Sequence, residues 1–246
     1  MKLKFKILIP LAVLVIAAVS YSRFLLFDRN NLNLPQNINN LHYQAYWWII
    51  PVGEAVLTVS ENQLYNGEDA VLIEAEAETK GIFETIFGIK TKMNSVVDAE
   101  TMLPILFREV TYRVDEKKED KIINYDQENN KLTTKDAICR ILPSTHDPLS
   151  AIMFLRNKDI KEGDNIEINL NSNRSNYKVG IDVMNKIKNR EREFFHLKGL
   201  SERRQGEKAR HRVEFSLYIT EGEHIPVLIR AFTPLGPIAF KLVNPD

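Results

Sequence analysis

The chain of 246 residues contains one cysteine, Cys139, and lacks the short motifs that identify common reactions. A single cysteine cannot form an internal disulfide, and the alternating stretch Ile138-Cys139-Arg140-Ile141 favours a small buried side chain over a reactive thiol. There is no Gly-x-Ser-x-Gly elbow, no His-Glu-x-x-His pair and no glycine-rich phosphate loop. The motifs therefore predict no catalytic residue, no cofactor and no metal site.

The histidines also lack the spacing of a metal site. No two of them are two or four residues apart, so a zinc site would need convergence from distant parts of the chain. His146 beside Asp147 is the best candidate for acid–base chemistry. We interpret Asp147 instead as the N-cap of a helix, and adjacent side chains at a cap point apart. The five histidines are His42, His146, His196, His211 and His224.

The N-terminus has the layout of an export signal, with three lysines before the apolar run 7–19. Two readings stay open. Ala18 and Ser20 suit cleavage after residue 20, whereas the large apolar side chains of residues 24–27 extend the run into a membrane anchor. No cysteine directly follows the run, which excludes lipid attachment through a lipobox. We expect a signal peptide or anchor over residues 1–27, a linker over 28–40, and a single β-rich domain over 41–246.

Composition indicates that the exported part is globular. The chain is 44% hydrophobic and 27% charged, and its 33 basic residues balance its 33 acidic residues. A domain this long buries roughly 70% of its unfolded-chain surface, so it needs no disulfide or metal to form a core. Disordered and fibrous classes are thereby disfavoured.

From residue 41 onward hydrophobic residues recur with a period of two, which is typical of half-buried strands. Turn residues separate these runs, for example Asn66-Gly67 and Glu221-Gly222. We predict an antiparallel all-β domain of ten to twelve strands, too many to lie flat. The clearest alternating stretches are 71–78, 105–114, 165–170, 176–184 and 213–219.

One helix interrupts the predicted strands. Asp147 suits an N-cap and Pro148 the first helical position, and Leu149, Ile152 and Met153 follow at helical spacing as predicted core residues. A second apolar stretch, residues 82–89, fits neither period and predicts a loop or short helix over the sheet. The predicted fold is a strongly curled antiparallel sheet or open barrel with one short helix packed on it, preceded by the signal or anchor helix.

Several segments resemble the domain of unknown function 3108 family in their order and spacing, over about residues 41–243. The resemblance implies a bacterial exported protein with a β-rich fold, and hence a periplasmic location, either soluble after cleavage or tethered to the inner membrane through residues 7–27. The family has no assigned activity, so no catalytic residue follows from it. The segments are Pro51-Val52-Gly53-Glu54-Ala55, Val97-Asp98-Ala99-Glu100-Thr101 before Leu103-Pro104, His146-Asp147-Pro148-Leu149-Ser150 before Phe154-Leu155-Arg156, Gly163-Asp164, Ile225-Pro226-Val227 and Pro234-Leu235-Gly236.

Basic residues are concentrated between Lys186 and Arg212, where ten lysines and arginines stand against four glutamates. A predicted contact with anionic headgroups or lipopolysaccharide phosphates would use Arg203, Arg204, Arg210 and Arg212. The competing interpretation is that alternating basic residues keep an exposed hairpin soluble. Nucleic acid is not expected as a partner of an exported protein.

Two function classes remain. The favoured hypothesis is a non-enzymatic periplasmic module that binds an apolar or lipid-like envelope component on the concave side of the sheet. The alternative is a structural or assembly partner for an envelope protein, in which the same aromatics fill a packed core. An enzyme, such as a hydrolase, ranks third. The predicted ligand-contacting residues are Tyr43, Trp47, Trp48, Phe83, Phe87 and Phe154.

Overall fold

The computed structural model describes residues 35, 37–113, 118–189, 192–204, 212–233 and 236–243. The predicted signal or anchor, residues 1–27, lies outside these ranges, as do residues 28–34 and 36 of the predicted linker. Among the described residues no helix combines the length and the apolar character needed to cross a bilayer. Export and anchoring therefore stay predictions.

The described strands form one sheet in the order β8-β7-β6-β5-β4-β3-β2-β1-β15-β14-β13-β12-β11-β10-β9. Neighbouring strands are antiparallel, except that β9 and β10 are parallel. The strands are β1 (Asn40–Trp47), β2 (Ile50–Tyr65), β3 (Glu68–Thr79), β4 (Lys90–Asp98), β5 (Pro104–Tyr112), β6 (Glu119–Asp126), β7 (Lys131–Thr133), β8 (Ile138–Arg140), β9 (Thr145–His146), β10 (Asn165–Ser172), β11 (Ser175–Asn189), β12 (Arg192–Arg204), β13 (Arg212–Thr220), β14 (Pro226–Thr233) and β15 (Gly236–Val243).

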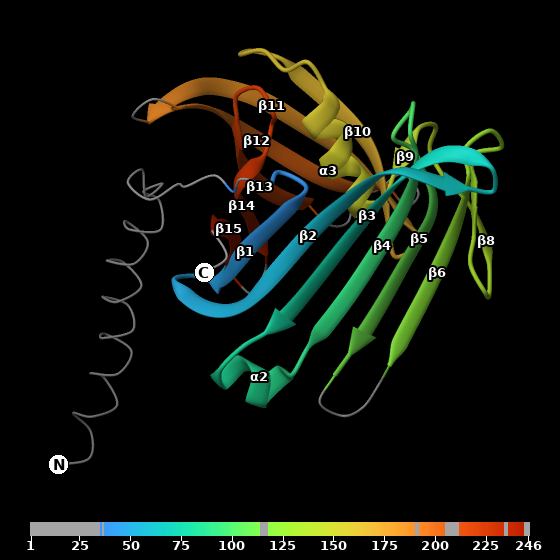
Figure 1. Cartoon of the computed structure of the whole chain (residues 1–246), viewed down its shortest axis with the longest axis horizontal. Helices are drawn as coiled ribbons and strands as arrows, with labels where there is room; N and C mark the ends of the chain where they lie inside the picture. Colours follow the sequence, from blue (N-terminus) through green and yellow to red (C-terminus); the bar gives the residue numbers. More distant parts are fainter. Residues whose placement is uncertain are drawn as a thin grey trace.

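The sheet curls until its two halves face each other (Figure 1). The first strand pairs with both β2 and the last strand, β15, whereas the two edge strands, β8 and β9, are consecutive in the chain. Extra residues in β2, β5, β11 and β14 shift the register against the neighbouring strands, and such bulges add to the twist that curls the sheet. The predicted curled antiparallel sheet is confirmed. It has more strands than expected, because β7, β8 and β9 are too short to show a period.

The gap between the two edges of the sheet is bridged by side-chain amides. Asn176 Nδ2 donates to the backbone oxygen of Arg140 at 3.0 Å, and Asn169 Nδ2 donates to that of Pro143 at 2.8 Å. Gln127 Nε2 donates to the backbone oxygen of Thr145 at 2.9 Å. These bonds satisfy carbonyl groups that a closed ladder would otherwise pair. The result is an open barrel held together across its seam.

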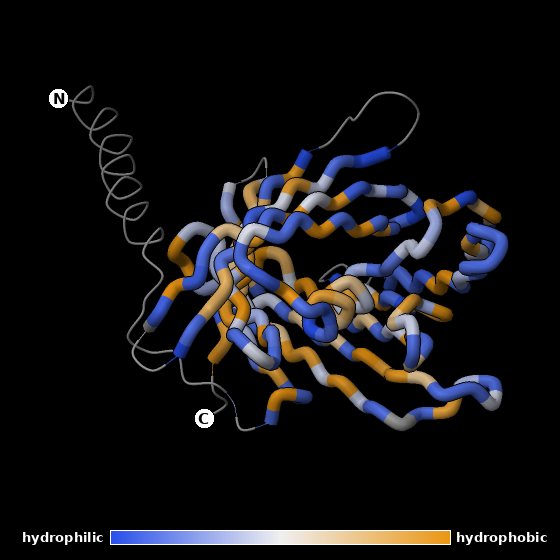
Figure 2. Tube along the Cα trace, turned by 90° about the horizontal axis from the view of Figure 1, so that it is seen from above, coloured by the Kyte–Doolittle hydropathy of each residue, from blue (hydrophilic) through white to orange (hydrophobic). Residues whose placement is uncertain are grey.

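Hydrophobic and hydrophilic residues alternate along the strands (Figure 2). The inner face carries buried residues such as Leu57, Ile73 and Leu197, whereas the outer face carries charged residues such as Glu74 and Glu76. Because side chains alternate between the faces of a strand, this pattern fixes which side of the curl encloses the core.

Helix α3 (Pro148–Asn157) fills one end of the curl. Asp147 caps it by accepting hydrogen bonds from the backbone N–H groups of Leu149 and Ser150, and Ser150 returns a bond in a capping box. Leu149 and Met153 join a core cluster with residues of β1–β7 and β12–β15, and Leu155 joins a second cluster with β10–β13. The predicted cap and helix are confirmed, and so are Leu149 and Met153 as core residues.

Helix α2 (Ile82–Phe87) lies at the other end of β3 and β4, away from α3 (Figure 1). Of the loop or short helix predicted for the apolar stretch 82–89, the chain forms the short helix, but this helix lies beyond the ends of β3 and β4 and not over the sheet. Gly81 and Gly88, which flank it, both have positive φ angles, so glycine suits the turns on both sides. None of its residues is buried. We call the end that α2 and the β1–β2 turn border the open end.

Candidate functional site

Burial along the inner face decreases from the α3 end toward the open end. On β3, Ile73 is fully buried, whereas Ala75 and Ala77 on the same face are partly exposed. The neighbouring strand repeats this: Ser95 and Val97 are buried, and Met93 is partly exposed. Solvent therefore reaches apolar side chains on the inner face near the open end.

The opposite wall shows the same gradient. On β13, Leu217 and Ile219 are buried, while Phe215 is partly exposed. Two partly exposed residues of β15, Ile238 and Phe240, share this face because they pair in register with Trp47 and Ala45. The two walls thus present partly accessible apolar side chains toward the same interior.

Small side chains dominate the wall formed by β1–β3 at the open end. Ala45 lies opposite Gly53, and Ala55 lies opposite Ala77. Side chains this small put little bulk on the inner face at these positions. This surface of small and apolar residues on the inner face is the candidate site.

Polar groups of β4, β5 and β6 continue this face of the sheet at the open end, and they pair with one another. The hydroxyl groups of Thr91 and Thr111 are 3.2 Å apart, and Lys121 Nζ lies 3.7 Å from a carboxylate oxygen of Glu109. A site for an apolar ligand is lined mainly by apolar side chains with a few placed polar groups, and the walls formed by β1–β3 and β13–β15 offer the apolar part of such a lining.

The six predicted ligand-contacting aromatics lie in two places, the packed end and the open end. Tyr43 is buried on the inner face near α3, where its hydroxyl donates to the backbone oxygen of Pro226 at 2.9 Å. Burial raises its pKa, so it stays neutral. Phe154 lies on α3, with its ring centre 4.9 Å from that of His146. Both residues belong to the packed end.

The other four aromatics lie at the open end. Trp48, in the β1–β2 turn, packs its indole against Gly236, and its backbone N–H donates to the Pro237 oxygen at 2.9 Å. The Trp47 and Phe83 rings meet edge to face at 6.2 Å, and Phe83 stacks on Phe87 at 6.1 Å. The structure therefore does not gather the six aromatics in one cavity, and their contact with a ligand stays a prediction.

The described arginines of the predicted anionic contact do not share one face. Arg203 points to the inner face, where its Nη2 donates to Ser175 Oγ at 2.8 Å. Arg204 and Arg212 both pair with Glu202, at 3.5 and 2.8 Å. Arg210 lies outside the described residues.

A buried polar cluster surrounds the start of α3. Ser95 Oγ donates to Asp147 Oδ2 at 2.5 Å. Burial raises the pKa of the Asp147 carboxyl to about 6, against the lowering effect of its hydrogen bonds from Ser95, Ser150 and Leu149. Burial lowers the pKa of His146 to about 4. His146 Nδ1 and the Tyr125 hydroxyl have no hydrogen-bond partner among the described residues.

Comparison with known proteins places the chain in a family. A model for a protein of unknown function, DUF3108, matches residues 42–243. The chain belongs to this family. No curated protein matches it. Among solved structures, it is similar to the crystal structure of a beta-barrel-like protein of domain of unknown function DUF1849 from Brucella abortus, with a TM-score of 0.55 and 12% identity, over 84% of this chain and 96% of that chain. This likeness shows the fold alone.

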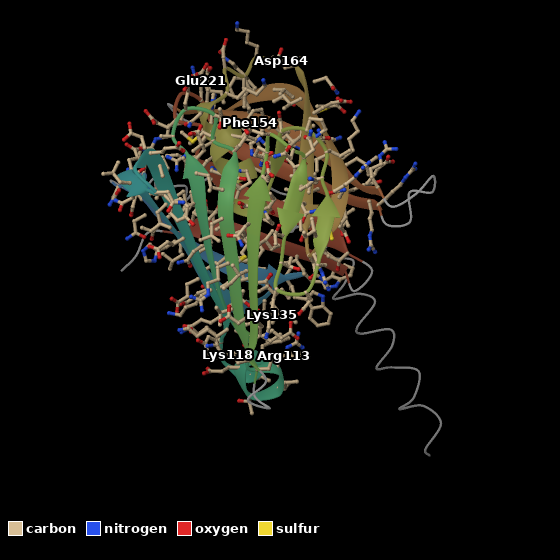
Figure 3. The ribbon with its side chains drawn as sticks, turned by 90° about the vertical axis from the view of Figure 1, so that its right-hand side faces the viewer. Arg113, Lys118, Lys135, Phe154, Asp164 and Glu221 are labelled. Atoms are coloured by element: carbon tan, nitrogen blue, oxygen red, sulfur yellow. The ribbon has the colours of Figure 1, made fainter. Side chains whose placement is uncertain are left out.

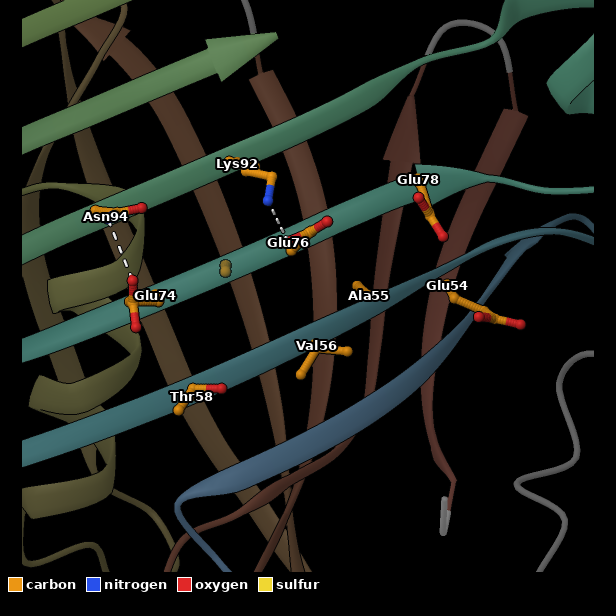
Figure 4. A pocket seen from close by; sticks show the side chains of 10 residues that line it. Glu54, Ala55, Val56, Thr58, Glu74, Glu76, Glu78, Lys92 and Asn94 are labelled. Atoms are coloured by element: carbon orange, nitrogen blue, oxygen red, sulfur yellow. Dashed lines mark hydrogen bonds and ion pairs between the residues drawn. The ribbon is translucent and has the colours of Figure 1, made fainter. Parts of the chain in front are cut away.

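The outer face of the DUF3108 domain carries a groove of about 420 Å³ on β2–β4 (Figure 4). Its glutamates have partners on the neighbouring strand: Glu76 forms ion pairs with Lys90 and Lys92, and Glu74 accepts a hydrogen bond from Asn94 Nδ2 at 3.3 Å. Hydrogen bonds from these lysines lower the pKa of Glu76. We interpret the groove as a solvated network of ion pairs and hydrogen bonds on the outer face of the sheet. No group that could hold a metal ion occurs among the described residues.

Sequence reasoning missed the small-residue wall of the DUF3108 domain and concentrated on large aromatics. The signal was present, because Ala75 and Ala77 alternate with glutamates and mark the inner face. The pairing of β1 with β15, which brings Ala45 opposite Phe240, joins residues nearly 200 positions apart and has no local signature.

Proposed function

We propose that this DUF3108 domain is an exported, non-enzymatic module of the bacterial cell envelope that binds an apolar or lipid-like component. The observation that supports this most strongly is the partly exposed apolar inner face at the open end, which includes Ala75, Ala77, Phe215 and Phe240. When an apolar ligand covers these accessible apolar side chains, the free energy of the complex falls by about 25 cal/mol for each Å² of apolar surface removed from water.

Export rests on the three N-terminal lysines and the apolar run 7–19. An apolar ligand suits this location, because lipids are the abundant apolar components of an envelope. The N-terminal segment would then either be removed or tether the domain to the inner membrane.

Two tryptophan substitutions on the same strand test the binding proposal. Ala77→Trp fills the inner face at the open end, whereas Glu74→Trp places the same side chain on the outer face. With a pyrene-labelled fatty acid as probe, we expect Ala77→Trp to weaken binding at least tenfold and Glu74→Trp to leave it unchanged.

Near-ultraviolet circular dichroism would establish that both variants are folded, and Ala77→Leu, a smaller filler, should have an intermediate effect. Equal binding by Ala77→Trp and Glu74→Trp would contradict an inner-face site. An unmodified protein that does not bind the probe would favour the alternative, a structural partner in envelope assembly.

A further inference from the structure

Exposed large hydrophobic side chains gather at the open end. They come from helix α2 and from the β1–β2 hairpin, where they occupy the end of β1, the turn and the start of β2, and their exposed fractions run from 38% for Trp47 to 75% for Ile82. We call this set the apolar tip: Trp47, Ile49, Ile50, Ile82, Ile86 and Phe87.

The apolar tip is a built feature of the fold. The Trp47 ring contacts Phe83 edge to face, which joins the β1–β2 turn to α2. Backbone hydrogen bonds fix both ends of the α2 segment, since Thr79 N donates to the Ile89 oxygen at 2.9 Å and Lys80 N donates to the Val52 oxygen at 3.0 Å. The exposed side chains therefore stand on a fixed support.

Helix α2 is amphipathic over its short length. Ile82, Phe83, Ile86 and Phe87 follow a helical spacing, and the polar Glu84 and Thr85 lie between them. The domain buries none of these residues. A soluble domain rarely exposes a contiguous apolar group of this kind unless it contacts a partner or a membrane.

Basic side chains flank the tip. Arg113 and Lys118 lie beside α2, at the end of the domain away from Phe154 (Figure 3). The Lys118 ammonium lies 5.9 Å from the centre of the exposed Tyr112 ring. Neither Arg113 nor Lys118 forms an ion pair within the described residues. Long basic side chains beside exposed aromatic and aliphatic residues complement a surface that is apolar inside and anionic outside.

We propose that the apolar tip docks on the surface of a lipid bilayer that contains anionic lipid, with Trp47 and Phe87 at the boundary between headgroups and acyl chains and with Arg113 and Lys118 at the phosphates. This inference rests on the proposed function. Docking by the tip turns the open end of the inner face toward the bilayer, where an apolar ligand resides.

The length of the preceding chain is compatible with this orientation. If the apolar run stays in the membrane, the thirteen residues from Asp28 to Asn40 span at most about 45 Å. The eight residues of β1, which lead from Asn40 to Trp47, cover about 26 Å. The linker can therefore run past the length of β1 and still leave the tip on the same bilayer.

Two label positions of equal exposure test the docking. Ile82, in the tip, is 75% exposed and Leu64, at the α3 end of β2, is 74% exposed. Ile82→Cys and Leu64→Cys, each with Cys139→Ser, would carry a nitroxide in the full chain bound to vesicles of equal parts phosphatidylcholine and phosphatidylglycerol. We expect the ratio of oxygen to nickel-chelate accessibility to rise several-fold at position 82 and to stay unchanged at position 64.

The substitutions Ile86→Glu and Phe87→Glu should abolish the rise at position 82 while the N-terminal segment still holds the protein on the vesicles. If the accessibility ratio at position 82 in the otherwise unaltered tip stays at its value in water, the tip does not dock on the bilayer. If the protein is a dimer and the same two substitutions abolish the dimer, the tip is a protein contact instead.

Lipid extracted from the purified protein is measured separately. If the tip docks but no lipid is extracted, the proposed lipid binding is wrong and the docking stands. If lipid is extracted but position 82 stays in water, the docking is wrong and the lipid binding stands.

Discussion

The α3 end and the open end of this domain are formed by the same strands, yet apolar residues are buried at the first and exposed at the second. Ile73 near α3 is fully buried, whereas Ile82 at the open end is 75% exposed. At the α3 end a capped helix joins two hydrophobic clusters. The comparison teaches that stability is concentrated at one end, which leaves the other end with apolar surface available for contacts.

Truncating isoleucine at each end should give the largest difference. Ile73→Ala removes a fully buried side chain from the larger cluster and should lower the free energy of unfolding by about 4 kcal/mol. Ile82→Ala should change it by less than about 0.5 kcal/mol, because the side chain is already in water. Urea unfolding would measure both. Similar losses at the two positions would remove the contrast between the ends.

The helix cap gives the next largest effect. Asp147→Ala removes the acceptor for Leu149, Ser150 and Ser95 in a fully buried position. We expect a loss of about 3 kcal/mol, from the cap and the stranded hydroxyl together. Asp147→Asn keeps a capping oxygen and should lose less. If alanine and asparagine were equally harmful, the carboxylate charge rather than the cap would be what the site requires.

Two neighbouring groups at the α3 end should give opposite pH dependences. The carboxyl of Asp147 has a pKa of about 6 in the folded chain, above its ordinary value of 3.8, so it favours folding at low pH and this contribution is lost as pH rises through 6. His146 has a pKa of about 4, below its ordinary 6.5, so protonating it favours unfolding and stability rises with pH from about 4 to 6.5.

The wild-type protein should therefore show a nearly flat stability between pH 4.5 and 6.5. Asp147→Asn leaves His146 as the group that titrates there, and we expect its stability to rise by about 2 kcal/mol over this range. Urea midpoints at the two pH values would measure it. A flat profile in Asp147→Asn would show that His146 is more accessible to water than its burial indicates.

The seam between β8 and β9 should give the smallest effect. Asn176→Ala removes the bond to the Arg140 oxygen and also the acceptor for the buried Asn171 Nδ2, and we expect a loss of about 1–1.5 kcal/mol. Hydrogen exchange of β7 and β8 should accelerate in this variant and that of β13 should not. Unchanged exchange in β8 would mean that the amide bridge does not hold the seam.

Local sequence pattern predicted most of the architecture. Alternation predicted the strands and their inner faces, and Asp147-Pro148 predicted α3 with its cap. Each of these signals is carried by residues only a few positions apart in the sequence. The short strands β7–β9 have two or three residues and show no period. The pairing of β1 with β15 depends on the whole curl, which no local pattern encodes.

The positions of the aromatic residues could not be predicted from residue type. Their residue type predicts that they line the concave side together, whereas the structure places Tyr43 and Phe154 in the packed end and Phe83 and Phe87 on α2. That helix lies in the connection between β3 and β4, beyond the sheet, so no wall covers its apolar residues. The flanking Gly81 and Gly88 marked this segment as separate from the strands.

The most direct test of the account is mass spectrometry of an organic extract of the protein, purified from its host without detergent exchange. If the inner face at the open end binds an apolar envelope component, the extract should contain one class of lipid at close to one molecule per chain, and the amount should fall in Ala77→Trp but not in Glu74→Trp. If folded protein gives an extract without lipid, the inner face does not bind an apolar envelope component.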